Sequence, residues 1–414
     1  MDQQLNQKAG SYLKQLCVDI SERCVGSEGN RRAADLLENY LRSFNFKTSR
    51  PAFDCLDWSA EGVTLRAGEE CFPVRISPYS VGGKVNAPLV TVSSVEELKQ
   101  VAGEGMVVLL KGEIAREQLM PKNFPFLNLP EHREIIDLLE RGGFKAVVCA
   151  TSYHPEMAGG VYPFPLIEDG DFVLPSVYLT DREGERLAQH QGEMVSLEVK
   201  VSRQPARGYN VVGCKGKSGY PGVVFCAHMD SKQGTPGALD NAAGLIVLLL
   251  LAEQLKDYRG AIPVEIVTLN GEDYYSNPGE VLYLKEIQKH PENIMLGVNI
   301  DGVGYVKGET SVSSYGCPPV VEEVVCRLIS STSGIVQGKP WYQGDHALFI
   351  QNGIPALGIT SERMEDILAV AHTPQDNPEL VDCTKLGTAA NFLVRLLHEL
   401  NQVSNKTAYW KPGD

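Results

Sequence analysis

Six side chains in the C-terminal half of this 414-residue chain have the chemistry to bind metal ions and move protons. They are two imidazoles and four carboxylates: His228, Asp240, Glu272, Asp273, Asp301 and His372. Carboxylates gathered in one place repel one another unless a cation lies among them. A mixed imidazole and carboxylate set suits zinc, with cobalt or manganese as alternatives. Two ions bridged by one shared carboxylate would use five of these groups and leave the sixth for acid–base catalysis.

Short apolar runs precede most of these residues and predict the strands that position them. The expected strands are Asn210–Val212, Val223–Ala227, Val264–Leu269, Met295–Ile300 and Ala356–Ile359, and the expected helices are Ala242–Leu255, Val281–Ile287, Val320–Ile329 and Thr384–Leu400. This alternation predicts a three-layer α/β/α sandwich with a mixed, largely parallel central sheet. Because parallel strands end at one edge of a sheet, residues that follow them converge there. Each residue taken singly would be an ordinary loop residue, but their repeated position at strand ends favours a metal site.

The stretch around His228 carries the densest information. His228 stands where the strand Val223–Ala227 should end, and a loop containing Gly and Pro leads from it to Asp240. Asp240 or Asn241 can cap the following helix, which is apolar almost all round and therefore expected to be buried. Asp230 could accept a hydrogen bond from the second ring nitrogen of His228 and so fix its tautomer.

The first part of the chain differs from this pattern. Residues 4–47 predict two helices joined by the turn-rich segment 23–30. From about residue 60 to 203, short strands predominate around one helix, Glu131–Arg141, and prolines interrupt the connections. We therefore expect one discontinuous domain, residues 1–57 and 206–414, and a β-rich inserted domain, residues 58–205.

Composition argues against several classes of protein. The formal net charge of −14 disfavours nucleic acid or an anionic membrane as the main partner. The longest apolar run, Ala242–Ala252, is well short of the roughly 20 residues that cross a bilayer. The first residues lack the basic start and apolar core of a secretory signal, and the ten cysteines include no Cys-x-x-Cys pair. We therefore expect a cytoplasmic protein with reduced thiols.

Five motifs follow one another in the C-terminal half: His-x-Asp at 228–230, Pro-Gly-Ala-x-Asp-Asn-Ala-x-Gly at 236–244, Asn-Gly-Glu-Asp at 270–273, Asn-x-Asp-Gly at 299–302 and His-Thr-Pro-x-Asp at 372–376. In this order they resemble peptidase family M28. That family comprises zinc peptidases, including aminopeptidases and the glutamate carboxypeptidase group, with glutaminyl cyclases as relatives. The resemblance implies a zinc pair, with His228 and Asp301 on one ion, Asp273 and His372 on the other, and Asp240 as the bridge. It also implies that Glu272 is the general base, and we group Asp230 with it as a catalytic residue.

Further resemblances concern the substrate side of the site. The segment 344–349 resembles the family's Asp-His segment, so Asp345, His346 and Tyr342 are the candidates for contacting substrate. We expect His346 or Tyr342 to donate a hydrogen bond to the substrate carbonyl. Two positions depart from the family pattern: Asp273 stands where many members have glutamate, and Ala371 where some relatives have an aromatic residue.

The insert resembles a protease-associated domain, a β-rich module that several M28 enzymes carry ahead of the catalytic half. The segments that carry this likeness are 107–112, 142–148 and 174–179. The resemblance implies that the insert is a module separate from the catalytic domain.

The function predicted by these features is metal-assisted hydrolysis of peptide bonds, with aminopeptidase action on short peptides as the leading interpretation. Neither nucleic acid nor a membrane is expected as a partner, and the sequence does not indicate an oligomeric state. Three competing functions remain. A carboxypeptidase of the glutamate carboxypeptidase type would need a basic pocket, for which Arg363 or Lys339 could serve. A glutaminyl cyclase would use a single zinc ion, and a non-catalytic binding module would need neither base nor full ligand set.

Overall fold

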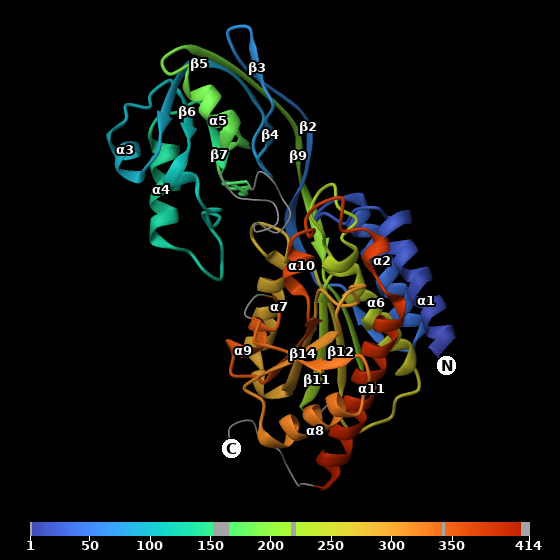
Figure 1. Ribbon diagram of the computed structural model, residues 1–414. Coiled ribbons are helices and arrows are strands. Elements are labelled where there is room, and N and C mark those ends of the chain that lie inside the picture. The colour runs from blue at the N-terminus through green and yellow to red at the C-terminus, as the bar shows by residue number, and fades with distance from the viewer. Residues whose placement is uncertain (1, 152–164, 217–220, 342–343, 407–414) are drawn as a thin grey trace. The chain divides into compact units, whose positions relative to one another are not determined.

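The computed structural model describes residues 2–151, 165–216, 221–341 and 344–406 (Figure 1). The chain divides into two compact units. The first, which we call the sandwich unit, comprises Met1–Cys55 and Arg207–Asp414; the second, the inserted unit, comprises Leu56–Ala206. All of the predicted site residues belong to the sandwich unit.

The sandwich unit is built on one eight-stranded sheet. Its strands are β1 (Lys47–Ser49), β10 (Val211–Lys215), β11 (Gly222–His228), β12 (Val264–Leu269), β13 (Ile294–Ile300), β14 (Thr310–Tyr315), β15 (Ile335–Gln337) and β16 (Ala356–Ser361). Their order in the sheet is β1-β10-β12-β11-β13-β16-β14-β15. The central strands β12, β11, β13 and β16 are parallel, whereas β10 and β14 join them antiparallel. The predicted mixed, largely parallel sheet is therefore confirmed.

Helices cover both faces of this sheet. They are α1 (Asp2–Lys14), α2 (Glu28–Ser43), α6 (Ala243–Gln254), α7 (Pro278–Lys289), α8 (Pro319–Ser330), α9 (Ala347–Ile350), α10 (Met364–Leu368) and α11 (Cys383–Lys406), with the shorter turns η1 (Gln15–Asp19), η3 (Ala238–Ala242), η4 (Pro291–Asn293) and η5 (Pro378–Leu380). Helices α1, α2, α6 and α11 pack together on one face, and α7 and α9 lie on the other (Figure 1). The predicted three-layer α/β/α arrangement is confirmed.

Helix α6 anchors the loop that precedes it. All ten residues from Ala243 to Ala252 are buried, because α6 lies between β11 and the helices α1, α2 and α11. Full burial of one leucine side chain stabilises a fold by about 1.5–3 kcal/mol, so this helix is held firmly in the core. The turn η3, which contains Asp240, is therefore attached to a rigid element. In the described part of the chain, no helix is long and apolar enough to cross a membrane.

The inserted unit has its own eight-stranded sheet. Its strands are β2 (Ala52–Ala67), β3 (Glu70–Phe72), β4 (Arg75–Ile76), β5 (Gly83–Val92), β6 (Val107–Leu110), β7 (Ala146–Thr151), β8 (Ser176–Thr180) and β9 (Met194–Tyr209), in the order β3-β2-β9-β5-β6-β7-β8-β4. Separate apolar clusters form from its buried side chains, one including Leu89 and Leu109, the other Val108 and Ile135. Its helices are α3 (Val95–Gln100), α4 (Pro130–Arg141) and α5 (Asp181–Ala188), with the turn η2 (Gly112–Ala115).

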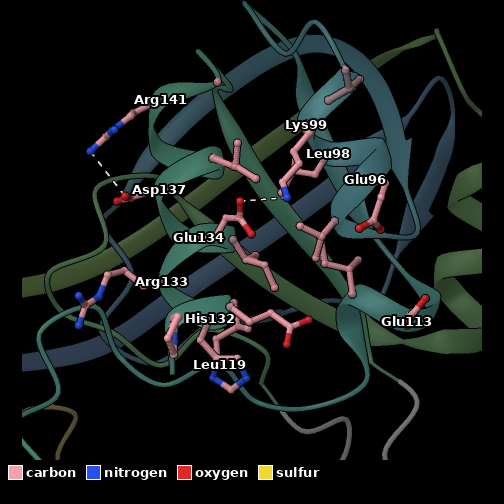
Figure 2. A pocket seen from close by; sticks show the side chains of 18 of the residues that line it. Glu96, Leu98, Lys99, Glu113, Leu119, His132, Arg133, Glu134, Asp137 and Arg141 are labelled. Carbon is pink, nitrogen blue, oxygen red and sulfur yellow. Dashed lines mark ion pairs between the residues drawn. The ribbon is translucent and has the colours of Figure 1, made fainter. Parts of the chain in front are cut away.

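A groove of about 980 Å³ lies in the inserted unit, between α3, η2 and α4 (Figure 2). Ion pairs lie along it: Nζ of Lys99 is 3.0 Å from Glu134, and Arg141 is 3.5 Å from Asp137. His132 is buried at its side, and Nδ1 accepts a hydrogen bond from the amide of Met120 (3.0 Å). None of the predicted site residues lines this groove, so the candidate chemistry and this hollow belong to different units.

Candidate metal centre

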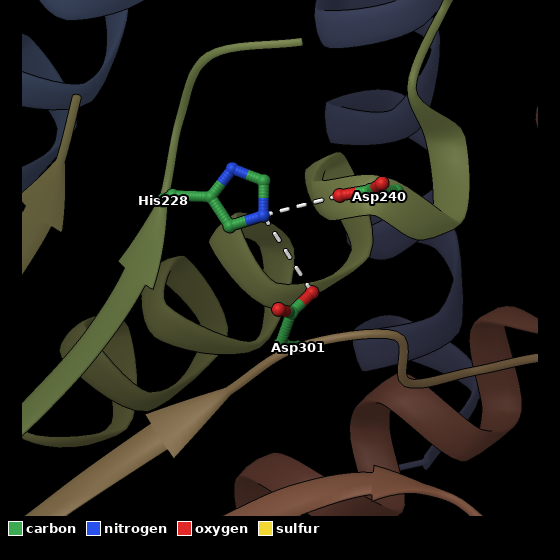
Figure 3. A group of neighbouring side chains, drawn as sticks. All are labelled: His228, Asp240 and Asp301. Atoms are coloured by element: carbon green, nitrogen blue, oxygen red, sulfur yellow. Dashed lines mark ion pairs between the residues drawn. The ribbon is translucent and has the colours of Figure 1, made fainter. Parts of the chain in front are cut away.

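The first candidate metal site consists of His228, Asp240 and Asp301 (Figure 3). Nε2 of His228 lies 3.1 Å from Oδ1 of Asp240 and 3.6 Å from Oδ1 of Asp301. His228 is the last residue of β11, and Asp301 directly follows β13, the strand beside it. Parallel pairing of β11 with β13 therefore brings these two side chains to one edge of the sheet, and η3 supplies Asp240.

The second candidate site consists of Asp240, Asp273 and His372. Nε2 of His372 lies 2.9 Å from Oδ1 of Asp273 and 3.2 Å from Oδ2 of Asp240. Asp273 belongs to the loop after β12, the other neighbour of β11, and His372 lies in the loop between α10 and η5. The two oxygens of Asp240 thus face different histidines. One carboxylate shared between two ligand sets is the arrangement found in two-metal sites.

The electrostatics of this cluster favour positive charge. Burial by itself lowers the pKa of His228, but Asp301, Asp230 and Asp240 outweigh burial and raise that pKa well above its ordinary value. Burial likewise lowers the pKa of His372, and Asp273 and Asp240 raise it well above the ordinary value. The carboxylates therefore create a strongly negative potential at the point where the two imidazoles meet them.

Several polar atoms in this cluster are better suited to bind a metal ion than to form hydrogen bonds. Both ring nitrogens of His228 and Oδ2 of Asp273 are buried and make no hydrogen bond within the described residues. Buried polar atoms are nearly always paired, so atoms left in this state at a site of opposite charges call for another partner. Imidazole nitrogens and carboxylate oxygens in two sets of three match the donors that divalent transition metals take.

Residues 210–397, which contain all of these side chains, match peptidase family M28. The resemblance to this family that the five sequence motifs predicted is confirmed over these residues. Aminopeptidase YwaD of Bacillus subtilis (strain 168) is 22% identical over 418 residues, covering 94% of this chain and 84% of YwaD. BSAP, a zinc aminopeptidase from Bacillus subtilis, has a similar structure with a TM-score of 0.73, at 20% identity over 95% of both chains. The aminopeptidase from Aneurinibacillus sp. strain AM-1 gives a TM-score of 0.71, at 20% identity over 96% of both chains.

Asp230 binds different groups from the one that the sequence predicted. Its Oδ1 lies 3.8 Å from Nδ1 of His228, which is too long for a hydrogen bond. Its two oxygens instead accept hydrogen bonds from the amides of Gly271 (2.7 Å) and Asp273 (3.0 Å). Asp230 therefore holds the loop that carries Glu272 and Asp273, and fixing the tautomer of His228 is not supported by the geometry. The loop folds over Asp230 from a neighbouring strand, which residue spacing around His228 could not indicate.

Glu272, the predicted base, precedes Asp273 and is half-buried. Its backbone carbonyl accepts a hydrogen bond from Nδ2 of Asn277 (3.2 Å), which helps to hold the loop. Burial raises the pKa of Glu272 well above its ordinary value; His228 opposes this increase, whereas Asp273 and Asp301 add to it. A carboxyl group with raised proton affinity is suited to accept and release a proton near neutral pH.

His346 does not fit the predicted role of hydrogen-bond donor to substrate. Its ring is buried and stacked on Tyr315, with ring centroids 4.6 Å apart, and Nε2 donates to the carbonyl of Trp341 (2.7 Å). Burial lowers the pKa of His346, which favours the neutral imidazole with its single N–H. Because the carbonyl already takes that N–H, none remains for a substrate. Tyr342, the other predicted donor, lies outside the described residues.

Asp345 is a buried carboxyl group behind the site rather than an exposed contact. Only 4% of it is accessible, and its Oδ2 has no hydrogen-bond partner within the described residues. Burial raises the pKa of Asp345 to about 7; His228 opposes the rise, and the charge of Asp301 adds to it. A direct substrate contact through Asp345 is therefore not evident in this structure.

Two supporting residues lie within the recognised motifs but could not be assigned from them. Asn241 donates from Nδ2 to the carbonyl of Ile300 (2.9 Å) and accepts from the amide of Gly244 (3.0 Å). The helix-capping role predicted for Asp240 or Asn241 thus falls to Asn241, and Asp240 is free for metal. Asp376 accepts from the amides of Leu239 (2.8 Å) and Asp240 (3.1 Å). The capping contact of Asn241 with Gly244 is local, whereas its contact with Ile300 and both contacts of Asp376 join distant segments that no local pattern reveals.

Proposed function

We propose that this chain is an aminopeptidase of the M28 type that uses two zinc ions per chain to release N-terminal residues from peptides. The observation that carries the proposal is the pair of three-residue ligand sets that share Asp240. The relatives support it as well, because two of them are named aminopeptidases and a third a zinc aminopeptidase. Cobalt or manganese are alternatives for the same donors.

The residues divide into ligands and one base. His228 and Asp301 would hold one ion, Asp273 and His372 the other, and Asp240 would bridge them. When bound, such a pair supplies Lewis acidity and lowers the pKa of water. The carboxylate of Glu272 accepts the proton of the attacking water and then delivers it to the leaving amine. Asp230 keeps Glu272 and Asp273 in place by binding the amides on either side of Glu272.

A carboxypeptidase is less well supported by the side chains near the site. Such an enzyme needs a cation to bind the C-terminal carboxylate of its substrate. Arg363, one predicted candidate, already donates through Nη2 to both carboxylate oxygens of Asp366, at 3.1 and 2.8 Å. A glutaminyl cyclase would need one zinc ion, and a binding module would need no catalytic base. Two complete ligand sets beside a carboxyl group of raised pKa favour the two-zinc peptidase over the cyclase and the binding module.

The inserted unit is, in this proposal, a protease-associated module of about residues 58–205. The division of the chain at Leu56 and Ala206 supports such boundaries. Within the sandwich unit, Nε of Arg207 lies 3.4 Å from Asp54, and the amide of Asn210 donates to the carbonyl of Pro51 (3.1 Å). The two segments of that unit are therefore paired where the insert departs. A cytoplasmic location stays a prediction of the sequence.

The proposal is tested by incubating the zinc-loaded protein with three versions of one short peptide: unmodified, N-acetylated and C-amidated. We expect sequential release of N-terminal residues from the unmodified and amidated peptides and none from the acetylated peptide. A metal chelator should stop the release, and returning zinc should restore it. Cleavage of the acetylated peptide from its C-terminus would overturn the aminopeptidase assignment in favour of a carboxypeptidase. Cyclisation of an N-terminal glutamine without hydrolysis would favour the cyclase.

A further inference from the structure

Arg23 is a completely buried arginine in the segment between η1 and α2. Nε donates to the carbonyl of Met229 (2.9 Å), and Nη1 donates to the carbonyls of Leu16 (2.9 Å) and Pro236 (2.7 Å). Nη2 donates to the carbonyl of Gly237 (2.9 Å). Its own amide donates to Oγ of Ser231 (3.0 Å). This one residue therefore makes four contacts with a single loop, residues 229–237.

The loop that Arg23 holds connects two of the candidate metal ligands. Met229 follows His228 directly, and Pro236 and Gly237 lie shortly before Asp240. The guanidinium thus binds both ends of the loop, just after the ligand His228 and just before the ligand Asp240. A planar group with five N–H donors in fixed directions can bridge several carbonyls in this way, whereas a lysine ammonium cannot reproduce the same geometry.

Neutral main-chain groups, rather than a carboxylate, compensate the positive charge of Arg23 by hydrogen bonding. Within the described residues, the guanidinium donates to carbonyl oxygens, and no carboxylate forms an ion pair with it. Burial of a cation without a paired anion is costly for a protein. An arginine kept in such a place indicates that the loop geometry requires it.

Contacts on the opposite side complete the support of this loop. Arg23 binds the carbonyls of Pro236 and Gly237, while Asp376 accepts from the amides of Leu239 and Asp240. Gly237 has a left-handed φ of 57°, and a Cβ atom there would lie 2.9 Å from Nη2 of Arg23 and 2.8 Å from Cβ of Ser231. The close approach of the guanidinium to the loop is therefore possible only for glycine.

Arg23 is itself fixed to the other ligand loop. Its carbonyl accepts a hydrogen bond from Nδ2 of Asn30 (2.8 Å). Asn30 in turn exchanges two hydrogen bonds with Asn270, at 2.8 and 3.0 Å, and Asn270 precedes the loop of Glu272 and Asp273. The N-terminal segment thus contacts both loops that carry candidate ligands.

We propose that Arg23 is a positioning residue for the metal centre, whose guanidinium sets the loop between His228 and Asp240 so that both side chains reach one cation. This inference rests on the proposed function in one respect, namely that the cation is zinc. Arg23 does not touch the reacting atoms. It acts through the backbone carbonyls of Met229, Pro236 and Gly237.

The test measures zinc dissociation constants by competition with a chromophoric chelator, for the full chain and for Arg23→Ala and Arg23→Lys. Removing a residue that orients metal ligands typically weakens metal binding by about 10–100-fold, and we expect Arg23→Ala to fall in that range. The zinc affinity of Arg23→Lys should lie between those of Arg23→Ala and the unchanged protein. Lysine keeps the positive charge but lacks the planar guanidinium whose N–H donors reach several carbonyls at once. Guanidinium ions at low, non-denaturing concentration should restore part of the affinity of Arg23→Ala but not of Arg23→Lys.

Two control variants separate positioning from general destabilisation. Arg395→Ala removes an arginine of the same unit that binds Oγ1 of Thr332 and Oγ of Ser331. Leu328→Ala removes a buried side chain of α8 and lowers stability without touching the loop. Hydrogen–deuterium exchange of metal-free protein provides a second measurement. We expect faster exchange of residues 229–241 in Arg23→Ala and unchanged exchange there in both controls.

The results distinguish failure of this inference from failure of the proposed function. If Arg23→Ala binds zinc as tightly as the unchanged protein, or no more weakly than Leu328→Ala, the positioning role is wrong. If the unchanged protein binds no zinc, the proposed function fails, and exchange of residues 229–241 alone then decides the role of Arg23. If Arg23→Ala does not fold, the test is made with Arg23→Lys. Equal zinc affinity of Arg23→Lys and the unchanged protein would then overturn the claim that the planar guanidinium positions the loop.

Discussion

The two units of this chain differ in where they place clusters of charged side chains. In the sandwich unit, His228 and Asp273 are buried, with 1% and 3% of their side chains exposed, at the meeting point of two ligand sets. In the inserted unit, the buried Asp169 accepts hydrogen bonds from main-chain amides, and many other charged groups pair at the surface, as Lys99 does with Glu134, whose side chains are 44% and 47% exposed. Both units contain many acids and bases, but among the described residues the clusters of candidate metal ligands lie in the sandwich unit.

The energetic cost of these two arrangements differs widely. Removing a charge from water costs several kcal/mol, and such groups persist only where hydrogen bonds, other charges or a ligand compensate them. An exposed ion pair contributes about 0–1 kcal/mol and needs no special explanation. This difference favours the sheet edge of the sandwich unit as the place of the proposed chemistry, although a groove of about 980 Å³ lies in the inserted unit. The predictions below test whether this contrast holds.

The largest expected effect is on catalysis by Glu272→Gln. This substitution keeps the shape of the side chain and removes its basicity. Proton transfer by a positioned group contributes about 10²–10⁴-fold, so kcat should fall by that order while zinc content stays unchanged. Steady-state kinetics together with elemental analysis of the same sample measure both quantities. A variant that loses an ion instead would show that Glu272 is a ligand.

Asp273→Asn should respond to added metal in the opposite way. Asp273 lies 2.9 Å from Nε2 of His372 in the second ligand set, so this substitution should weaken one zinc site. We expect excess zinc to restore part of the rate of Asp273→Asn and none of the rate of Glu272→Gln. Zinc titrations of both variants under identical conditions make the comparison. Equal responses would mean that the two neighbouring residues have been assigned the wrong roles.

Asp230→Asn should lower stability without removing a metal ligand. Asparagine offers one carbonyl oxygen in place of two carboxylate oxygens, so one of the buried amides of Gly271 and Asp273 would lose its acceptor. An unsatisfied buried donor costs about 1–3 kcal/mol. Chemical denaturation of metal-free protein should show a loss of that size. A loss of zinc affinity with unchanged stability would instead favour a role in which Asp230 acts on His228.

The smallest expected effect concerns a surface cluster of the inserted unit, in which His190 lies 3.1 Å from Glu70 and 2.7 Å from Glu193. Glu193 and Glu70 raise the pKa of His190 above its ordinary value. A histidine whose pKa is higher in the folded state stabilises that state fully below its unfolded pKa, and the contribution is lost as pH rises through the folded pKa. His190→Gln should therefore remove a small stabilisation at mildly acidic pH and have no effect at alkaline pH. Thermal unfolding of the two proteins across this pH range measures the difference. A large loss would contradict the assignment of this cluster to the solvated surface.

The sequence predicts the sheet and its ligand loops well because the relevant signals are local. Apolar runs such as Val223–Ala227 correspond to buried parallel strands, and the chemistry follows directly at their ends. Strands β14 and β15 are absent from the predicted set, because Thr310–Tyr315 is rich in Ser and Thr and Ile335–Gln337 is only three residues long. These segments form strands because β14 pairs with β16 and β15 pairs with β14, and such long-range pairing stabilises them where local strand propensity is weak.

Long-range contacts explain what the sequence could not indicate at the site. Arg23 falls in a segment predicted only as a turn, and four of its hydrogen-bond partners lie more than 200 residues away. Asp230 is predicted to bind its neighbour His228, whereas the loop after β12 binds it in the structure. The predicted ligands, by contrast, come together mainly from the ends of adjacent strands, so sheet topology is enough to bring most of them close.

The most direct test of the central claim is the zinc content of the purified chain and of Asp240→Asn, measured by elemental analysis and equilibrium titration. Because Asp240 faces both His228 and His372, at 3.1 and 3.2 Å, the account predicts two ions per unchanged chain. It also predicts that the single change Asp240→Asn weakens binding of both ions. One ion per fully active chain, or an Asp240→Asn variant that loses only one of two ions, would contradict a centre built on a shared carboxylate.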